Sequence, residues 1–155
     1  MNYLDIQLVS DCAEIPTPAM MQTWVDAVLK DSEHDSEIVI RLVDEQESAE
    51  LNAQYRHKSG PTNILSFPFE APEGLELDLL GDLVVCAPLL ALEAAQQQKP
   101  LLAHWAHIVV HGVLHLLGYD HLEEAEAEEM EALEIQILGT LNIDNPYLDR
   151  ELSHE

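Results

Sequence analysis

Short apolar segments and longer segments with helical spacing alternate along the chain. Alternating or continuous apolar residues predict four strands, at residues 3–10, 36–44, 62–69 and 79–86. Helical spacing between capping and breaking residues predicts five helices, at residues 17–31, 45–56, 88–99, 101–117 and 123–141. This mixed order favours an α+β fold with a mixed four-stranded sheet, or a three-layer α/β arrangement. We expect residues 1–155 to form a single domain.

Several helix ends carry specific signals. Thr17 is a suitable N-cap, because Pro18 follows it at the first helical position. Asp44 can cap the helix that begins after it. Gly118 is expected to end the helix before it, since a left-handed residue at that place is usually glycine.

The predicted helix at 101–117 is apolar all round, which indicates a buried central helix. Its polar exceptions are spaced by three, four and four residues, so they lie on one stripe: His104, His107, His111 and His115. Buried imidazoles are costly unless each ring is hydrogen-bonded or bound to something. The stripe therefore needs partners that the sequence does not identify directly.

The spacing of His111 and His115 allows both rings to bind one metal ion. Gly118 lets the chain reverse, so that His121 can return as a third ligand. Three nitrogens leave one position of a tetrahedral zinc open, as in catalytic sites. We predict one Zn²⁺ per chain at these three histidines.

Other residues near the predicted metal have less specific roles. A hydrogen-bonded core position or a supporting contact is the better expectation for His104 and His107. Asp120 either orients a ligating imidazole or only shapes the turn, and the sequence does not decide between the two.

The histidine spacing is that of the metzincin protease motif HExxHxxGxxH, with one change. The glutamate that serves as general base in those proteases is replaced by Gly112, which can accept no proton. We expect this glycine to leave open space beside the metal for a bulkier substrate, or for one that brings phosphate oxygens as ligands. A metallopeptidase whose base comes from elsewhere, such as Asp82, remains an alternative.

The chain has 30 acidic and 6 basic side chains and a formal net charge of −24, which by itself argues against a nucleic-acid partner. However, residues 51–69 and 94–119 contain no acid, so together they could line one site that tolerates an anion. The acidic run at 123–134 is expected to be a solvated helix face. A phosphate substrate needs a cation, and Arg56 is the first choice because arginine can hold phosphate through two hydrogen bonds, with Lys58 nearby.

No apolar run reaches the roughly 18–20 residues of a membrane span, and the N-terminal residues do not resemble a signal peptide. Cys12 and Cys86 are isolated thiols without metal-binding or disulfide spacing, which favours a reducing compartment. We therefore expect a cytoplasmic protein with no membrane partner.

Three segments together resemble the YbeY endoribonucleases, a family of rRNA maturation factors: YRHKSGPTNILSFPF (55–69), LLGDLVVC (79–86) and HGVLHLLGYDH (111–121). The resemblance extends from about residue 37 to residue 147, and the family also has glycine at the position of Gly112. It implies a zincin-like central helix, zinc held by His111, His115 and His121, and an arginine important for RNA cleavage at Arg56.

The resemblance also implies single-strand-specific endoribonuclease activity in 16S rRNA 3′-end maturation and ribosome quality control. Its implied partners are single-stranded rRNA, the small ribosomal subunit with its proteins, and a ribosome-associated GTPase. In this interpretation Arg56 and His111 are the catalytic residues, and Arg56 and Lys58 bind the substrate. Whether water or the RNA 2′-hydroxyl attacks stays open, as does the general base.

The acidic composition affects how RNA would be bound. Free RNA should bind weakly, with binding that falls steeply as salt rises, so we expect the ribosome or a partner to present the substrate. A non-enzymatic alternative is a ribosome assembly factor whose zinc mainly stabilises the fold. Three ligands and an open position argue against a purely structural ion.

Overall fold

The computed structural model describes residues 2–12, 14–30, 36–69, 79–119 and 124–146. Its four strands form one mixed sheet in the order β1-β2-β4-β3. The strands are β1 (Tyr3–Leu8), β2 (Glu37–Val43), β3 (Ile64–Pro68) and β4 (Leu79–Cys86). β1, β2 and β4 are parallel to one another, and β3 pairs antiparallel with β4. The helices are α1 (Pro18–Val28), α2 (Glu45–Arg56), α3 (Ala87–Gln96), α4 (Leu101–Leu116) and α5 (Glu124–Thr140).

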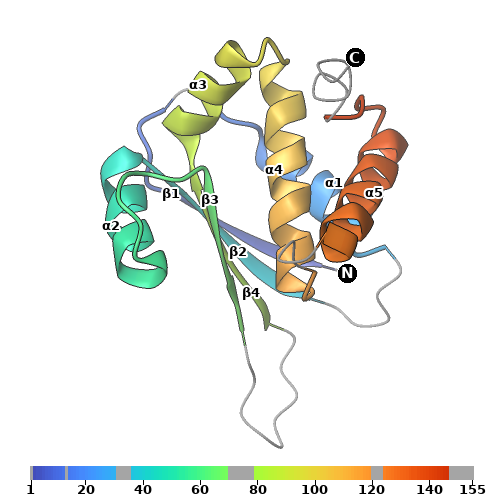
Figure 1. Ribbon diagram of the computed structural model, residues 1–155, viewed down its shortest axis with the longest axis horizontal. Helices are drawn as coiled ribbons and strands as arrows, with labels where there is room; N and C mark the ends of the chain where they lie inside the picture. Colours follow the sequence, from blue (N-terminus) through green and yellow to red (C-terminus); the bar gives the residue numbers. More distant parts are fainter. Residues whose placement is uncertain (1, 13, 31–35, 70–78, 120–123, 147–155) are drawn as a thin grey trace, which may run out of the picture.

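The helices cover both faces of the sheet, as Figure 1 shows: α2 lies on one face, and α1, α4 and α5 lie on the other. The main core fills the space between the sheet and this second group, with Trp105 of α4 fully buried at its centre. A smaller core cluster of Val43, Leu65 and Val84 lies on the α2 face, with Leu51 packed against it. The predicted α+β fold with a mixed four-stranded sheet is therefore confirmed.

Local signals in the sequence explain the start of α1 and the end of α4. The Thr17 hydroxyl accepts a hydrogen bond from the amide of Met20 at 3.2 Å, as an N-cap should. Gly118 has φ +102, so the left-handed helix end predicted there is confirmed. β2 and β4 are the central strands, and most of their apolar residues are buried, whereas Arg41 and Asp82 within them are half-buried and exposed.

The position predicted for Asp44 at the start of α2 is confirmed, but the capping bond expected from its side chain is not formed. Asp44 occupies the N-cap position of α2, but its side chain makes no capping hydrogen bond. Its carboxylate instead accepts hydrogen bonds from the Ser10 hydroxyl and from the amide of Asp11. The carboxylate therefore binds the segment after β1 instead of the first amides of α2, and it connects that segment to the start of the helix.

No helix in the described part of the chain combines the length and apolar character that a membrane span requires.

Candidate active-site cleft

The four histidines of α4 form a continuous row along one side of the helix. Successive ring centroids lie 6.4, 6.4 and 4.6 Å apart from His104 to His115. The helix carrying them is largely buried, because its remaining side chains pack against the sheet and three other helices. The predicted stripe on a buried central helix is therefore confirmed.

His111 and His115 converge through their ring nitrogens, whose Nε2 atoms lie 3.1 Å apart. Two imidazole nitrogens bound to a tetrahedral zinc at about 2.0–2.1 Å would lie about 3.3–3.4 Å apart. The observed separation is close to that value without any rearrangement of the helix. The pair therefore fits two ligand positions of one metal ion.

The partner of His111 is Glu134, which comes from α5. Nδ1 of His111 lies 2.5 Å from Oε1 of Glu134, and Nε2 of His107 lies 3.7 Å from the same oxygen. A carboxylate accepts, so Nδ1 of His111 carries the proton and its Nε2 lone pair faces His115. This arrangement of carboxylate, imidazole and open nitrogen is typical of metal-binding histidines.

The solvated helix face expected for residues 123–134 is wrong for Glu134, which has 0% exposed surface. On α5 the buried residues are Met130, Glu134 and Leu138, at a spacing of four residues. The sequence did contain a signal for the burial of Glu134, because it lies on one helical stripe with two apolar residues. The many acids around it obscured that signal. The role considered for Asp120, orienting an imidazole, is filled at His111 by Glu134.

His121, the expected third ligand, lies outside the described residues, as does Asp120. Within the ranges that the structure describes, no group of three or more His, Cys, Asp or Glu side chains is placed to hold a metal ion. The third ligand therefore stays a prediction.

A cleft of about 660 Å³ opens beside the two imidazoles. The lining residues that the structure describes all come from the two acid-free segments of the sequence: Tyr55, Arg56, Thr62, Asn63, Ile64, Leu65, Ser66, Phe67, His111 and His115. The structure therefore brings these segments together, as predicted, and places Arg56 in the same cleft as the histidine pair. The other two candidates, Lys58 and Asp82, are exposed and do not line this cleft.

The open space expected at Gly112 is not there. A Cβ at this position would lie 2.6 Å from Cδ1 of Ile64 and 2.9 Å from Cδ2 of Leu83. One residue beyond His111, the helix surface has turned toward the sheet, and the Gly112 carbonyl accepts a long hydrogen bond from Ser66. The glycine permits close packing of α4 on β3 and β4, and it contributes no open space of its own.

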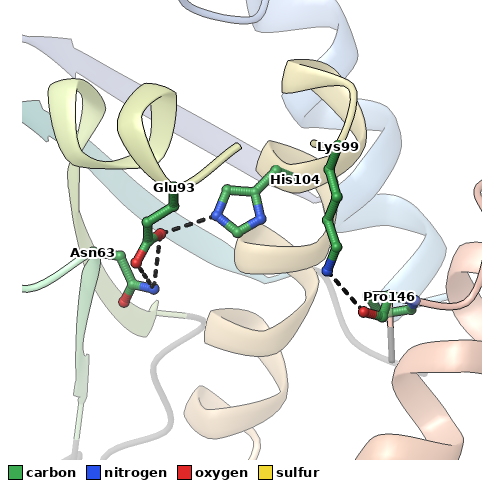
Figure 2. Close-up of polar contacts among 5 residues, drawn as sticks. All are labelled: Asn63, Glu93, Lys99, His104 and Pro146. Carbon is green, nitrogen blue, oxygen red and sulfur yellow. Dashed lines mark hydrogen bonds and ion pairs between the residues drawn. The ribbon is translucent and has the colours of Figure 1, made fainter. Parts of the chain in front are cut away.

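His104, at the N-terminal end of the histidine stripe, has a structural role. Nε2 of His104 lies 2.9 Å from Oε1 of Glu93, whose carboxylate also accepts hydrogen bonds from Nδ2 of Asn63. Figure 2 shows these three side chains and their contacts. His104 is 4% exposed, so the core role expected for it is confirmed. This chain of contacts ties α3 and α4 to Asn63, which lines the cleft. In the same view, Lys99 donates to the carbonyl of Pro146 and fastens the segment after α5.

Comparison with known proteins identifies the family. The model of the endoribonuclease YbeY family matches residues 7–142, a span that contains Arg56 and the paired histidines. Among solved structures, the chain is similar to TM1509 from Thermotoga maritima, with a TM-score of 0.58 and 24% identity over 92% of each chain. That likeness concerns the fold alone, whereas the family match covers most of the sequence. The chain therefore belongs to the YbeY endoribonuclease family.

Proposed function

We propose that this protein is a zinc-dependent endoribonuclease that cuts single-stranded rRNA. The observation that carries the proposal is the placement of Arg56 in one cleft with the convergent nitrogens of His111 and His115, among described lining residues that include no acid. A phosphodiester is an anion, and a cleft whose described lining residues include no carboxylate suits it on so acidic a chain.

His111 and His115, together with His121 from beyond the described residues, would hold the ion. Imidazole nitrogens suit zinc among the common metals. When bound, zinc would polarise the scissile phosphate or lower the pKa of a water molecule. Glu134 keeps the proton on Nδ1 of His111, so that the Nε2 lone pair stays directed at the ligand position.

Arg56 is the residue that would meet the charge of the reaction. Its guanidinium can donate two parallel hydrogen bonds to the non-bridging oxygens of one phosphate. Charge grows on those oxygens as the phosphodiester is attacked, so a fixed arginine stabilises the transition state more than the ground state. The last turn of α2 positions this side chain at the cleft.

The biological setting follows from the family. We propose 16S rRNA 3′-end maturation and ribosome quality control in the cytoplasm, by a single domain spanning residues 1–155. The small ribosomal subunit with its proteins, and a ribosome-associated GTPase, would present the RNA. The net charge of −24 supports the proposal that a partner presents the RNA, because the acidic surface outside the cleft repels free RNA.

The alternatives differ in what the metal does. In an assembly factor the ion would stabilise the fold only, and Arg56 would be dispensable. A peptidase needs a carboxylate base in the cleft, whereas none of the described lining residues is acidic and Glu134 contacts His111. Neither alternative has a structural observation in its favour.

The test uses purified, zinc-loaded protein and a labelled 16S rRNA 3′-end fragment, with and without chelator. Arg56→Ala is compared with Lys30→Ala, which removes an exposed cation that does not line the cleft. We expect cleavage to require metal and Arg56 but not Lys30. Equal cleavage by Arg56→Ala and the unaltered protein would contradict the proposal. Metal-dependent folding without cleavage, either of the free fragment or of the same RNA presented on the small ribosomal subunit, would favour the assembly factor.

A further inference from the structure

Two aromatic rings stand beside Arg56 in the cleft. The ring centroids of Tyr55 and Phe67 lie 5.1 Å apart in an edge-to-face arrangement at 73°. Tyr55 is 56% exposed, although it is held in place by its neighbour, and both rings line the cleft. Edge-to-face contact uses the edge of one ring and leaves aromatic surface available to a third group. Neither ring has a role in the chemistry described above.

The cleft has little charge with which to hold RNA. Arg56 is the one lysine or arginine among its described lining residues, and the whole chain carries a net charge of −24. Affinity for a polyanion must therefore come from contacts that do not depend on charge. Stacking of bases on aromatic side chains is the usual contact of this kind in proteins that bind single strands.

Strand β3 adds backbone groups to the same cleft. It is an edge strand, paired only with β4 in the described sheet. Backbone hydrogen bonds from Cys86 to Asn63 and from Phe69 to Leu80 show which residues of this segment face β4. By antiparallel alternation, Ile64 and Ser66 direct their N–H groups outward, along the free edge that lines the cleft.

We infer that Tyr55 and Phe67 form a stacking site for one unpaired base, beside a phosphate held by Arg56. The adjoining sugar-phosphate backbone runs along the free edge of β3, where the outward N–H groups can donate to it. A base in a duplex already has both faces stacked, so this site accepts single strands only. The inference rests on the proposed function, since it names how that substrate is selected.

The test compares binding of a short fluorescent single-stranded RNA with binding of an abasic strand of the same length. Tyr55→Leu removes the exposed ring, and Tyr3→Leu is a matched control because Tyr3 is 55% exposed on β1, at the opposite edge of the sheet. We expect Tyr55→Leu to weaken RNA binding by about 5- to 100-fold and to leave abasic binding unchanged. The loss should be the same at low and high salt, because stacking releases no counterions. Tyr55→Phe keeps the ring and should keep the base-dependent affinity.

The outcomes separate this inference from the proposed function. Cleavage by the unaltered protein, with equal RNA affinity in Tyr55→Leu and Tyr3→Leu, would overturn the stacking site and leave the nuclease standing. Base-dependent binding that is lost in Tyr55→Leu, in a protein that cuts no RNA, would support the site and overturn the nuclease. Circular dichroism of each variant checks that the fold is kept.

Discussion

Nδ1 of His111 donates a hydrogen bond to Glu134, a carboxylate with no exposed surface that reaches it from another helix at 2.5 Å. A buried carboxylate is costly unless it is paired, so α5 must place this group accurately for the fold to tolerate it. The pairing fixes which nitrogen of His111 faces the cleft. α5, a helix whose surface is mostly acidic, is thereby part of the proposed metal site.

Glu134→Gln should weaken zinc binding by about 10- to 100-fold, because the neutral amide orients and polarises the imidazole less than the carboxylate does. Competition with a chromophoric chelator measures this affinity directly, without an RNA substrate. Glu129→Gln is the matched control, since Glu129 lies on the same helix and is exposed. Equal zinc affinities in the two variants would show that Glu134 has no influence on the metal.

Arg56→Ala should lower kcat/KM for RNA cleavage by about 100- to 1,000-fold, the usual effect of removing one donor that stabilises transition-state charge. Arg56→Lys keeps the charge but not the paired hydrogen bonds, so it should recover only part of the loss. Lys58→Ala should have a smaller effect than Arg56→Ala, because Lys58 does not line the cleft. Steady-state kinetics on one single-stranded substrate ranks the three variants, and the opposite order for Arg56 and Lys58 would reassign the phosphate site.

Gly112→Ala should destabilise the fold by about 1–3 kcal/mol, because the added methyl group overpacks the contact with Ile64. Urea unfolding measures the change. Gly139→Ala places the same substitution in α5 with nothing within 4 Å of the new atom, and it should stabilise by up to about 1 kcal/mol. Adding Ile64→Val to Gly112→Ala removes the clashing Cδ1 atom and should recover part of the loss. Similar effects at both glycines would mean that α4 has more room than the structure shows.

Burial raises the pKa of the Cys86 thiol, so its folded form resists ionisation. The thiol therefore favours folding below its unfolded pKa of about 8.5, and this contribution is lost as pH rises through that value and toward the folded pKa. At pH 8 a thiol reagent should modify the half-buried Cys12 well before Cys86, and both should react in denaturant. Mass spectrometry of the labelled peptides gives the order, and early modification of Cys86 would contradict its burial.

The sequence predicted the order of strands and helices well, because strong local signals mark them. Apolar runs, Thr17 with Pro18, and Gly118 each act within a few residues of their own position. The histidine pair was predictable for the same reason, since helical geometry alone places the two rings together. Asp44 shows the limit of such signals, because Ser10 and Asp11 from a distant segment take its carboxylate.

Three features that depend on contacts between distant elements were missed. Glu134 lies in an acidic run whose composition indicates solvent, and only the packing of α5 on α4 buries it. Gly112 was expected to border open space at the predicted metal site, whereas its close neighbours are Ile64 and Leu83 of the sheet. Tyr55 had no periodicity to mark it, because its importance comes from a ring on another element.

The free edge of β3 separates the two halves of the proposed site. Arg56 comes from α2, which rests on the sheet through Leu51 and the small cluster around Leu65, and His111 comes from α4 on the opposite face. The sheet lies between the two helices, so its thickness sets the distance between the Arg56 guanidinium and the His111 imidazole. A methyl group added or removed between α2 and the sheet would change that distance. Substitutions at positions that do not contact RNA should therefore change the rate of cleavage.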